Sequence, residues 1–134
     1  MLQPDELLVA VRIPVTGGRM GYAVEEFSRR AGDFAIVAAV AVVELQAGGR
    51  VARARVAVAG AGSVPARLVA TEQALAGAAP SVAALRQVVM DHRLEIEPDS
   101  DVHATAAYRG HLTRVLAVRA LTRAAFGASE GISP

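Results

Sequence analysis

The fold of this chain is decided by one stretch of its sequence, Phe34-Ala35-Ile36-Val37-Ala38-Ala39-Val40-Ala41-Val42-Val43-Glu44-Leu45. The stretch is rich in β-branched residues and has turn signals at both ends, which is typical of a strand that is covered on both faces. Its alanines leave a helix as the alternative. The sequence behind it, Gln46-Ala47-Gly48-Gly49-Arg50, has the glycines of a tight hairpin loop. We therefore expect residues 34–45 to begin an antiparallel hairpin.

The returning strand of this hairpin is predicted at residues 51–59. Alternation places a set of small apolar side chains on one face: Ala52, Ala54, Val56 and Val58. Arg53 and Arg55 fall on the opposite face, which should meet solvent or a partner.

Two further strands are predicted on the N-terminal side of the hairpin. Residues 7–13 alternate cleanly and end at a turn-forming sequence, with one face made of Leu7, Val9, Val11 and Ile13 and the end marked by Pro14 and Thr16-Gly17-Gly18-Arg19. Residues 21–28 alternate less cleanly, because Glu25-Glu26 interrupts the apolar positions. About four strands are thus expected before residue 60.

Helical periodicity replaces alternation after Pro65. Residues 71–76 carry helix formers and stop at Gly77, a suitable residue after a helix C-terminus. Ser81 is positioned to cap a second helix, whose apolar residues recur at three- and four-residue spacing: Val82, Leu85 and Val89. A last helix is predicted over residues 104–126, closed by Gly127, and residues 128–134 are expected to be a flexible tail.

Strands followed by a block of helices indicate an α+β fold, with an antiparallel sheet of about four strands followed by three helices packed on one face. A chain of 134 residues has a common size for one domain. No repeat, low-complexity segment or linker divides the sequence. We therefore expect residues 1–134 to form a single domain.

Composition excludes several classes of protein. The 14 basic and 13 acidic residues nearly cancel, so the chain lacks the charge expected of a nucleic-acid-binding protein. It has no cysteine, which excludes disulfides, iron–sulfur clusters and thiolate zinc sites within the chain and is compatible with a cytoplasmic location. The acidic N-terminus lacks the basic region of a signal peptide, and the longest apolar run, residues 34–43, is half of a membrane span. We expect a cytoplasmic protein without a membrane span.

The sequence Gly60-Ala61-Gly62-Ser63-Val64-Pro65 raises the question of a dinucleotide-binding turn, because it leads from a strand towards a helix. The third glycine of that motif is missing, and no alternation of strands and helices surrounds it. An ordinary turn is the favoured interpretation.

Metal binding and catalysis find equally little support. Asp101 and His103 are close in sequence, but His111 lies eight residues further along the predicted helix, a rise of about 12 Å, which is too far for one ion. His92 is interpreted as a partly buried imidazole. The serines lack the context of a catalytic nucleophile, and Glu25 and Glu26 point to opposite faces of a strand. We therefore predict neither catalytic residues nor a metal site.

Two other features favour a binding role. The corner Phe27-Ser28-Arg29-Arg30-Ala31-Gly32-Asp33-Phe34-Ala35 brings two guanidinium groups and a carboxylate together between strands. Arg30 and Asp33 could pair across it, Arg29 could project to a partner, or the corner could be a solvated turn.

The last helix is apolar on more than one side. One stripe consists of Tyr108, Leu112, Val115 and Phe126, and three further apolar residues lie outside it: Leu116, Val118 and Leu121. A helix of this kind is usually buried on several sides, so we expect a partner surface to cover part of it.

These segments together carry a family resemblance. In order along the chain they are Pro4-Asp5-Glu6-Leu7-Leu8, Glu26-Phe27-Ser28-Arg29-Arg30-Ala31-Gly32-Asp33-Phe34-Ala35-Ile36-Val37, the proline turn before Ala66-Arg67 with the helix after it, and Tyr108-Arg109. From residue 4 to residue 126 the chain resembles the C-terminal domain of the FAD-binding (medium) subunit of molybdenum hydroxylases, the carbon monoxide dehydrogenase and xanthine dehydrogenase family.

The resemblance implies an α+β domain inside a larger redox complex. In that family the subunit carries FAD, which receives electrons from iron–sulfur clusters in a small subunit, and a molybdopterin subunit reduces those clusters. Most flavin contacts come from two preceding domains, which this chain does not contain. The C-terminal domain completes the fold of the subunit and packs beside the flavin region.

The expected function is therefore that of an oxidoreductase component without an active site of its own, working with a flavin-binding domain, an iron–sulfur subunit and a molybdopterin subunit that selects the substrate. The residues expected to serve as structural or docking groups are Arg29, Arg30, Asp33, Tyr108 and Arg109. The rival interpretation is a stand-alone homodimeric interaction module that has lost the redox context, and a remnant without present function is a third.

Overall fold

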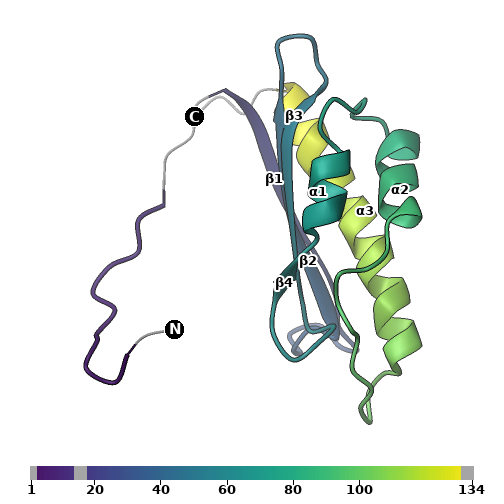
Figure 1. The fold of residues 1–134 in the computed structure, drawn as a ribbon. Helices are drawn as coiled ribbons and strands as arrows, with labels where there is room; N and C mark the ends of the chain where they lie inside the picture. Colours follow the sequence, from purple (N-terminus) through teal and green to yellow (C-terminus); the bar gives the residue numbers. More distant parts are fainter. Residues whose placement is uncertain (1–2, 14–17, 131–134) are drawn as a thin grey trace.

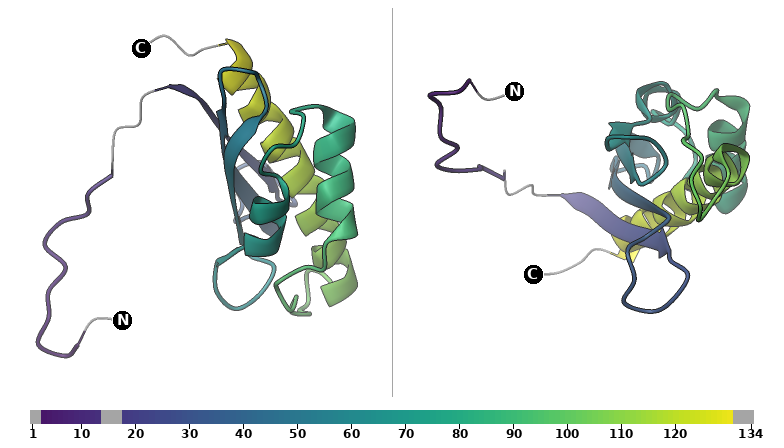
Figure 2. Two further views of the ribbon diagram at one scale, coloured as in Figure 1. Left: turned by 45° about the horizontal axis from the view of Figure 1, so that its top comes forward. Right: turned by 90° about the horizontal axis from the view of Figure 1, so that it is seen from below.

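The computed structural model describes residues 3–13 and 18–130. Four strands form one antiparallel sheet in the order β1-β2-β3-β4: β1 (Arg19–Phe27), β2 (Val37–Leu45), β3 (Val51–Ala59) and β4 (Ala66–Arg67). Three helices follow and lie on one face of the sheet, α1 (Val69–Ala74), α2 (Val82–Asp91) and α3 (Ala106–Glu130) (Figures 1 and 2). The predicted α+β architecture is confirmed.

Strand β2 is the centre of the core. Its side chains that point towards the helices are buried: Val37, Ala39, Ala41, Val43 and Leu45. On its other face Val40 is exposed and Val42 is only partly buried. The helical alternative for residues 34–45 is thus wrong, and the prediction of a strand covered on both faces holds for the helix side alone.

The hairpin from β2 to β3 forms as predicted, with one irregularity. A register shift at Glu44 and Leu45 pairs Leu45 with Val51, so Ala52 is an extra residue in the ladder. Ala52 is therefore exposed, whereas the other residues predicted for its face are buried: Ala54, Val56 and Val58.

The first predicted strand does not form. Residues 7–13 have no regular secondary structure, and their apolar side chains are exposed: Leu7, Leu8, Val9, Val11 and Ile13. In Figures 1 and 2 this segment runs apart from the sheet, so within residues 3–13 and 18–130 no neighbouring strand supplies hydrogen bonds to its backbone. The residues predicted to end it, 14–17, lie outside the described residues. The fourth strand is instead the short β4, which pairs with Ala57 and Val58.

Helix α3 lies directly against the edge strand β1. A Cβ atom at Gly21 would stand 2.0 Å from the carbonyl oxygen of Ala124 and 2.5 Å from the backbone nitrogen of Ala128, so glycine is required at this crossing. The helix runs through Gly127 to Glu130, and Ala128 is buried, so residues 128–130 do not belong to a tail. Residues 131–134 lie outside the described part of the chain.

The extra apolar side of α3 is covered within the chain itself. Leu116, Val118 and Leu121 are buried, and α3 contacts both the sheet and α2. The inference that a partner must cover these residues is therefore wrong, although Tyr108 and Phe126 remain exposed. Helix α2 begins as predicted, with Ser81 Oγ accepting a hydrogen bond from the backbone nitrogen of Ala84 at 3.3 Å.

None of the described helices combines the length and apolarity needed to cross a membrane.

Candidate functional site

The corner between β1 and β2 is closed by backbone and side-chain hydrogen bonds. The backbone N–H of Ile36 donates to the Phe27 carbonyl oxygen at 2.7 Å, which joins the two ends of the corner. Inside it, the Arg30 carbonyl oxygen accepts from Ser28 Oγ at 2.9 Å and from the Asp33 backbone nitrogen at 3.1 Å. The corner is thus an ordered turn rather than a loose loop.

The ion pair at this corner differs from the predicted one. Arg29 Nη2 lies 3.9 Å from Asp33 Oδ2, and both side chains are exposed. Pairing of Arg30 with Asp33 was one of the alternatives that the sequence left open, but the spacing of four residues brings Arg29 to the carboxylate instead. An exposed pair of this kind contributes about 0–1 kcal/mol to stability.

Arg109, at the start of α3, ties three distant segments together beneath the corner. Its Nη1 donates to the carbonyl oxygens of Ile36 at 2.8 Å and Gly60 at 2.5 Å, and its Nη2 donates to Asp101 Oδ2 at 2.6 Å. The side chain is buried, and its Nε atom has no partner among the described residues. The buried guanidinium of Arg109 thus bonds to three segments that are far apart in the sequence.

Asp101 is held ionised by its hydrogen bonds. Besides the Arg109 guanidinium, the backbone nitrogens of His103 and Ala104 donate to its Oδ1 at 2.8 and 2.9 Å. The hydrogen bond from Arg109 and then those from the two backbone N–H groups lower the pKa of Asp101 from 3.8 to about 2. With its lone pairs occupied in this way, Asp101 is suited to anchoring rather than to proton transfer.

Two aromatic residues complete the junction. The rings of Phe27 and Tyr108 meet edge to face, with centroids 6.2 Å apart and planes at 85°. The Tyr108 backbone nitrogen donates to Thr105 Oγ1 at 3.2 Å, the pattern of a helix N-cap, so the start of α3 is fixed beside the end of β1. Phe34, by contrast, is 99% exposed.

A small hollow of about 280 Å³ lies at the corner. Its lining is Arg29, Asp33, Phe34, Ala35, Ile36, Asp101, His103 and Arg109. Three of the five residues singled out by the sequence therefore meet at one place, and Tyr108 packs beside them. Arg30 does not line the hollow, although its side chain is exposed at the same corner.

The turn at Gly60 belongs to this packing and does not fit a phosphate-binding loop. Gly60 has a φ of +79°, and a Cβ atom there would lie 2.7 Å from the Ile36 carbonyl oxygen. A Cβ at Gly62 would lie 3.1 Å from the Glu97 carbonyl oxygen. The space that a pyrophosphate would need beside these glycines is filled by protein backbone, so the glycines serve close packing.

The histidines do not converge on one another. The backbone nitrogen of His103 caps the Asp101 carboxylate, and His92 Nδ1 lies 2.8 Å from the Val88 carbonyl oxygen. In residues 3–13 and 18–130, no group of three or more metal-ligating side chains is arranged to hold an ion.

Glu72 is a buried charged residue to which sequence reasoning assigned no role. Its Oε1 accepts from the Val56 backbone nitrogen at 2.9 Å and from Arg67 Nε at 3.0 Å, and its Oε2 pairs with Arg67 Nη2. Burial raises the pKa of this carboxyl, but the hydrogen bonds from Arg67 and Val56 outweigh it, so the pKa of Glu72 lies below its ordinary value. A single acidic residue at a helix start carries no sequence signal of such a contact.

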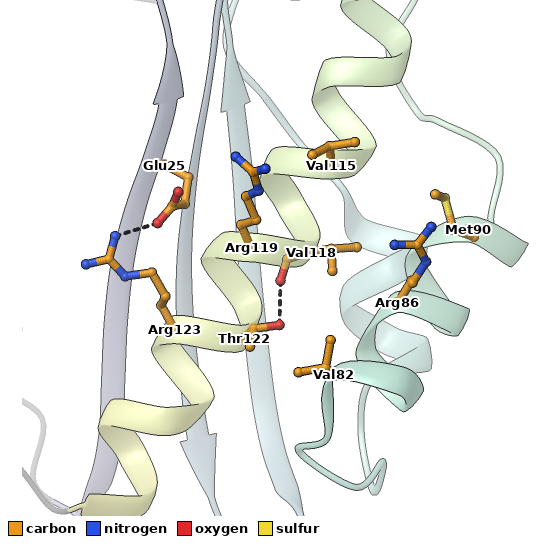
Figure 3. A pocket seen from close by; sticks show the side chains of 9 residues that line it. All are labelled: Glu25, Val82, Arg86, Met90, Val115, Val118, Arg119, Thr122 and Arg123. Atoms are coloured by element: carbon orange, nitrogen blue, oxygen red, sulfur yellow. Dashed lines mark hydrogen bonds and ion pairs between the residues drawn. The ribbon is translucent and has the colours of Figure 1, made fainter.

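A larger groove of about 610 Å³ lies between α2 and α3 (Figure 3). Its lining combines valines with three arginines: Glu25, Val82, Arg86, Met90, Val115, Val118, Arg119, Thr122 and Arg123. Arg123 Nη1 donates to Glu25 Oε1 at 2.6 Å. No residue lines both this groove and the corner hollow. None of the residues selected from the sequence as structural or docking groups lines the groove.

Comparison with known proteins gives consistent matches. The family model described as the CO dehydrogenase flavoprotein C-terminal domain matches residues 22–124. The chain is 35% identical over 121 residues to subunit alpha of the 6-hydroxypseudooxynicotine dehydrogenase complex of Paenarthrobacter nicotinovorans, covering 90% of this chain and 41% of that subunit. It is 35% identical over 123 residues to the carbon monoxide dehydrogenase medium chain of Afipia carboxidovorans, covering 92% and 42%.

Two solved structures also contain a chain that matches this one. A cyanide-inactivated Cu,Mo-CO dehydrogenase contains a chain that matches with a TM-score of 0.84 and 32% identity, covering 94% of this chain and 44% of that one. Quinoline 2-oxidoreductase from Pseudomonas putida 86 matches with a TM-score of 0.75 and 28% identity, covering 81% and 38%. The chain spans about two fifths of the length of the relatives it matches.

Proposed function

The chain belongs to the family of CO dehydrogenase flavoprotein C-terminal domains, and we therefore propose that it works as the C-terminal part of the flavoprotein subunit of a molybdenum-hydroxylase-type oxidoreductase. It contributes to assembly and to electron transfer through FAD without chemistry of its own. The single observation that carries this proposal is the family match over residues 22–124, which includes the corner and its anchor at Arg109.

The names of the relatives favour a role that is independent of substrate. Proteins 33–36% identical to this chain are named for 6-hydroxypseudooxynicotine, carbon monoxide, caffeine and nicotine. Because such different substrates go with one type of domain, we infer that this domain does not select the substrate. The substrate is then selected elsewhere in the complex, by the molybdopterin subunit.

The proposed cofactor and partners follow from the same family. FAD is held mainly by the flavin-binding domains of the subunit, and iron–sulfur clusters and molybdopterin are held by partner subunits in the cytoplasm. The glycines at 60 and 62 are packed against backbone, so this chain offers no phosphate cradle there. The contribution of the chain is to present a rigid surface against which these parts assemble.

The corner is the proposed docking surface. Arg109 and the Phe27–Tyr108 contact hold it in place from beneath, while the side chains of Arg29, Arg30, Asp33 and Phe34 project from it. Phe34 is the strongest docking candidate, because an aromatic side chain exposed over 99% of its surface gains most from burial in an interface.

The proposal is tested by gentle affinity purification of the chain from its source cell, with mass spectrometry and a visible absorption spectrum. We expect flavin-binding domains, on the same or on another polypeptide, together with iron–sulfur and molybdenum subunits. A colourless protein recovered alone or as its own dimer would contradict the proposal and favour the stand-alone module.

Single substitutions then locate the docking surface. Phe34→Ala should lower recovery of the partners by about tenfold, the loss of roughly 1–2 kcal/mol typical of an aromatic interface residue. The control Phe126→Ala removes an aromatic side chain that is 67% exposed on α3 and should change nothing. Asp33→Ala should loosen the corner and lower recovery less, and unchanged recovery with Phe34→Ala would exclude the corner as the docking surface.

A further inference from the structure

The groove between α2 and α3 has no part in the proposed function. Its lining extends from Val82 to Met90 on α2 and from Val115 to Arg123 on α3 (Figure 3). Eight residues of α-helix rise by about 12 Å, so the groove is about two helical turns long. Its volume of about 610 Å³ lies within the range of roughly 300–1,000 Å³ that is usual for small-molecule pockets.

The apolar part of the lining is aliphatic. It consists of Val82 and Met90 on α2 and of Val115 and Val118 on α3. Val82 is 57% and Met90 39% exposed, so the packing of the chain itself leaves these side chains accessible to a ligand. No aromatic ring is among the described residues that line the groove, so the groove offers no stacking surface for a planar ligand. A flexible hydrocarbon body suits it better.

Guanidinium groups stand on both walls of the groove. Figure 3 shows Arg86 of α2 and Arg119 of α3 on either side of Val115 and Val118. Both arginines are exposed, and neither forms a hydrogen bond or an ion pair with another described residue. An arginine presents its N–H donors in a planar fork that matches the two oxygens of a carboxylate. The walls therefore provide free donors for an anionic group.

The other polar groups of the lining are already engaged. Arg123 Nη1 donates to Glu25 Oε1 at 2.6 Å, so the one acidic residue among the described lining residues is neutralised by a third arginine. Thr122 Oγ1 donates to the Val118 carbonyl oxygen at 2.8 Å. The groove thus has an excess of positive charge from its two remaining arginines, and its own carboxylate does not oppose an incoming anion.

The extent of the groove favours a small molecule over a protein partner. Nine residues line it, whereas a standard protein–protein interface takes roughly 20–30 residues from each side. Small-molecule sites combine an apolar lining with a few polar groups that fix the orientation of the ligand. The valines and the two free arginines provide this combination within two helical turns.

We propose that the groove between α2 and α3 binds a small molecule that has an aliphatic body and one carboxylate. The body lies along Val82, Val115 and Val118, and the carboxylate binds the guanidinium groups of Arg86 and Arg119. This inference does not depend on the proposed function, because this chain alone forms the groove and no residue lines both the groove and the corner hollow.

Isothermal titration calorimetry of the full chain with octanoate tests the proposal. The neutral 1-octanol has an aliphatic body of the same length without the carboxylate, and 2-naphthoate has a carboxylate on an aromatic body. We expect octanoate to bind one to one, about tenfold or more tighter than 1-octanol, because hydrogen bonds to charged groups are the stronger ones. Octanoate should also bind more tightly than 2-naphthoate.

Substitutions assign the binding to the groove. Arg86→Gln and Arg119→Gln should each weaken octanoate binding by about tenfold, as expected when a charged hydrogen bond is lost. Arg93→Gln, at an exposed position after α2 and outside the groove, is the matched control and should leave the affinity unchanged.

Val82→Asp is a variant of a different kind. It places a negative charge in the lining, at the first residue of α2, where an acidic side chain is compatible with the helix. We expect it to abolish octanoate binding, and far-UV circular dichroism checks that each variant folds.

Three results would overturn the proposal. They are equal affinities for octanoate and 1-octanol, an unchanged affinity in both Arg86→Gln and Arg119→Gln, and the absence of saturable octanoate binding up to about 1 mM. Tighter binding of 2-naphthoate than of octanoate would overturn the aliphatic body.

The same titration is made with the chain in the complex purified from its source cell. If octanoate binds the isolated chain but not the complex, a partner polypeptide occupies the groove and the proposal fails. Recovery of the chain without partners would contradict the proposed function, whereas the titration of the isolated chain would still decide this inference.

Discussion

Arg109 is a buried charged residue that links three separate parts of the fold. Its guanidinium joins the end of the corner at Ile36, the turn at Gly60 and the loop at Asp101, which are far apart in the sequence. Family resemblance alone marked Arg109 beforehand. Periodicity could not, because an arginine at the start of a helix has the same local pattern whether it is solvated or buried.

Replacing Arg109 should therefore destabilise the whole domain. Arg109→Met keeps the length of the side chain but leaves the Ile36 and Gly60 carbonyl groups and the Asp101 carboxylate without their donor. We expect the free energy of unfolding to fall by roughly 2–4 kcal/mol, measured by urea denaturation. Arg119→Met, at an exposed position of the same helix, is the matched control and should stay within about 0.5 kcal/mol of the unmodified chain. Equal effects of the two substitutions would show that the Arg109 hydrogen bonds carry no net stability.

Asp101 should make stability depend on acid pH. Its pKa is about 2 in the folded chain against an ordinary 3.8, so between these values the unfolded chain binds more protons than the folded one. The contribution of Asp101 is thus complete above about pH 5 and is lost as the pH falls towards 2. Asp101→Asn should remove this part of the pH dependence.

The measurement is the free energy of unfolding of both proteins between pH 2 and pH 7. Their difference should be largest near neutrality and shrink in acid. Glu72, whose pKa is also lowered, remains in both proteins and leaves a common acid dependence. A difference that is constant over the whole range would contradict the assigned role of Asp101.

The sequence pattern predicts the structure best where an element is formed by contacts between residues that are close in sequence. The hairpin of β2 and β3, the second strand and the Ser81 cap were predicted from periodicity and turn chemistry, and all three form. Residues 7–13 have an equally good strand pattern, but no strand lies beside them among the residues that the structure describes. Alternation shows which face of a strand could be buried, but it does not show whether a neighbouring strand is present to pair with it. The strand β4 has only two residues, which is too short for an alternating pattern to appear in the sequence.

The contact of α3 with β1 was also invisible in the sequence, because it depends on the absence of a side chain. Gly21→Ala would bring a Cβ atom within 2.0 Å of the Ala124 carbonyl oxygen, and backbone cannot move aside as a flexible side chain can. The helix must then shift, and we expect a loss of roughly 1–3 kcal/mol in the free energy of unfolding, as for overpacked cores.

Gly48→Ala is the control for this substitution. A Cβ atom at Gly48, in the β2–β3 hairpin, has nothing within 4 Å, and stability should change by less than about 1 kcal/mol. Thermal unfolding followed by circular dichroism measures both variants. If Gly21→Ala were as stable as Gly48→Ala, α3 would not be fixed against β1 in solution.

The molecule as a whole depends on close approach rather than on large side chains. Of its 134 residues 29 are alanine, and alanines form much of the contact between α3 and the sheet. A composition this rich in alanine requires the elements to approach closely if they are to reach normal packing density, and element order predicted the layers. What neither could predict is which surface would remain apolar. The sequence favoured the last helix, but Leu116, Val118 and Leu121 of that helix are buried, although Tyr108 and Phe126 stay exposed. Further exposed apolar residues lie on the sheet, at Tyr22, Val24 and Val40.

The single-domain prediction has a sharp consequence for unfolding. Helix α3 is anchored at one end by Arg109 and Tyr108 beneath the corner and at the other end by the crossing with Gly21. The corner therefore cannot open without loosening the helix that covers the sheet, so we expect one cooperative transition. In a Tyr22→Phe variant, Tyr108 is the remaining tyrosine of a chain without tryptophan, and its fluorescence reports on the corner alone. Its urea midpoint should coincide with that of the far-UV circular dichroism. An earlier loss of the tyrosine signal would show that the corner unfolds by itself, and it would then be a poor candidate for a rigid docking surface.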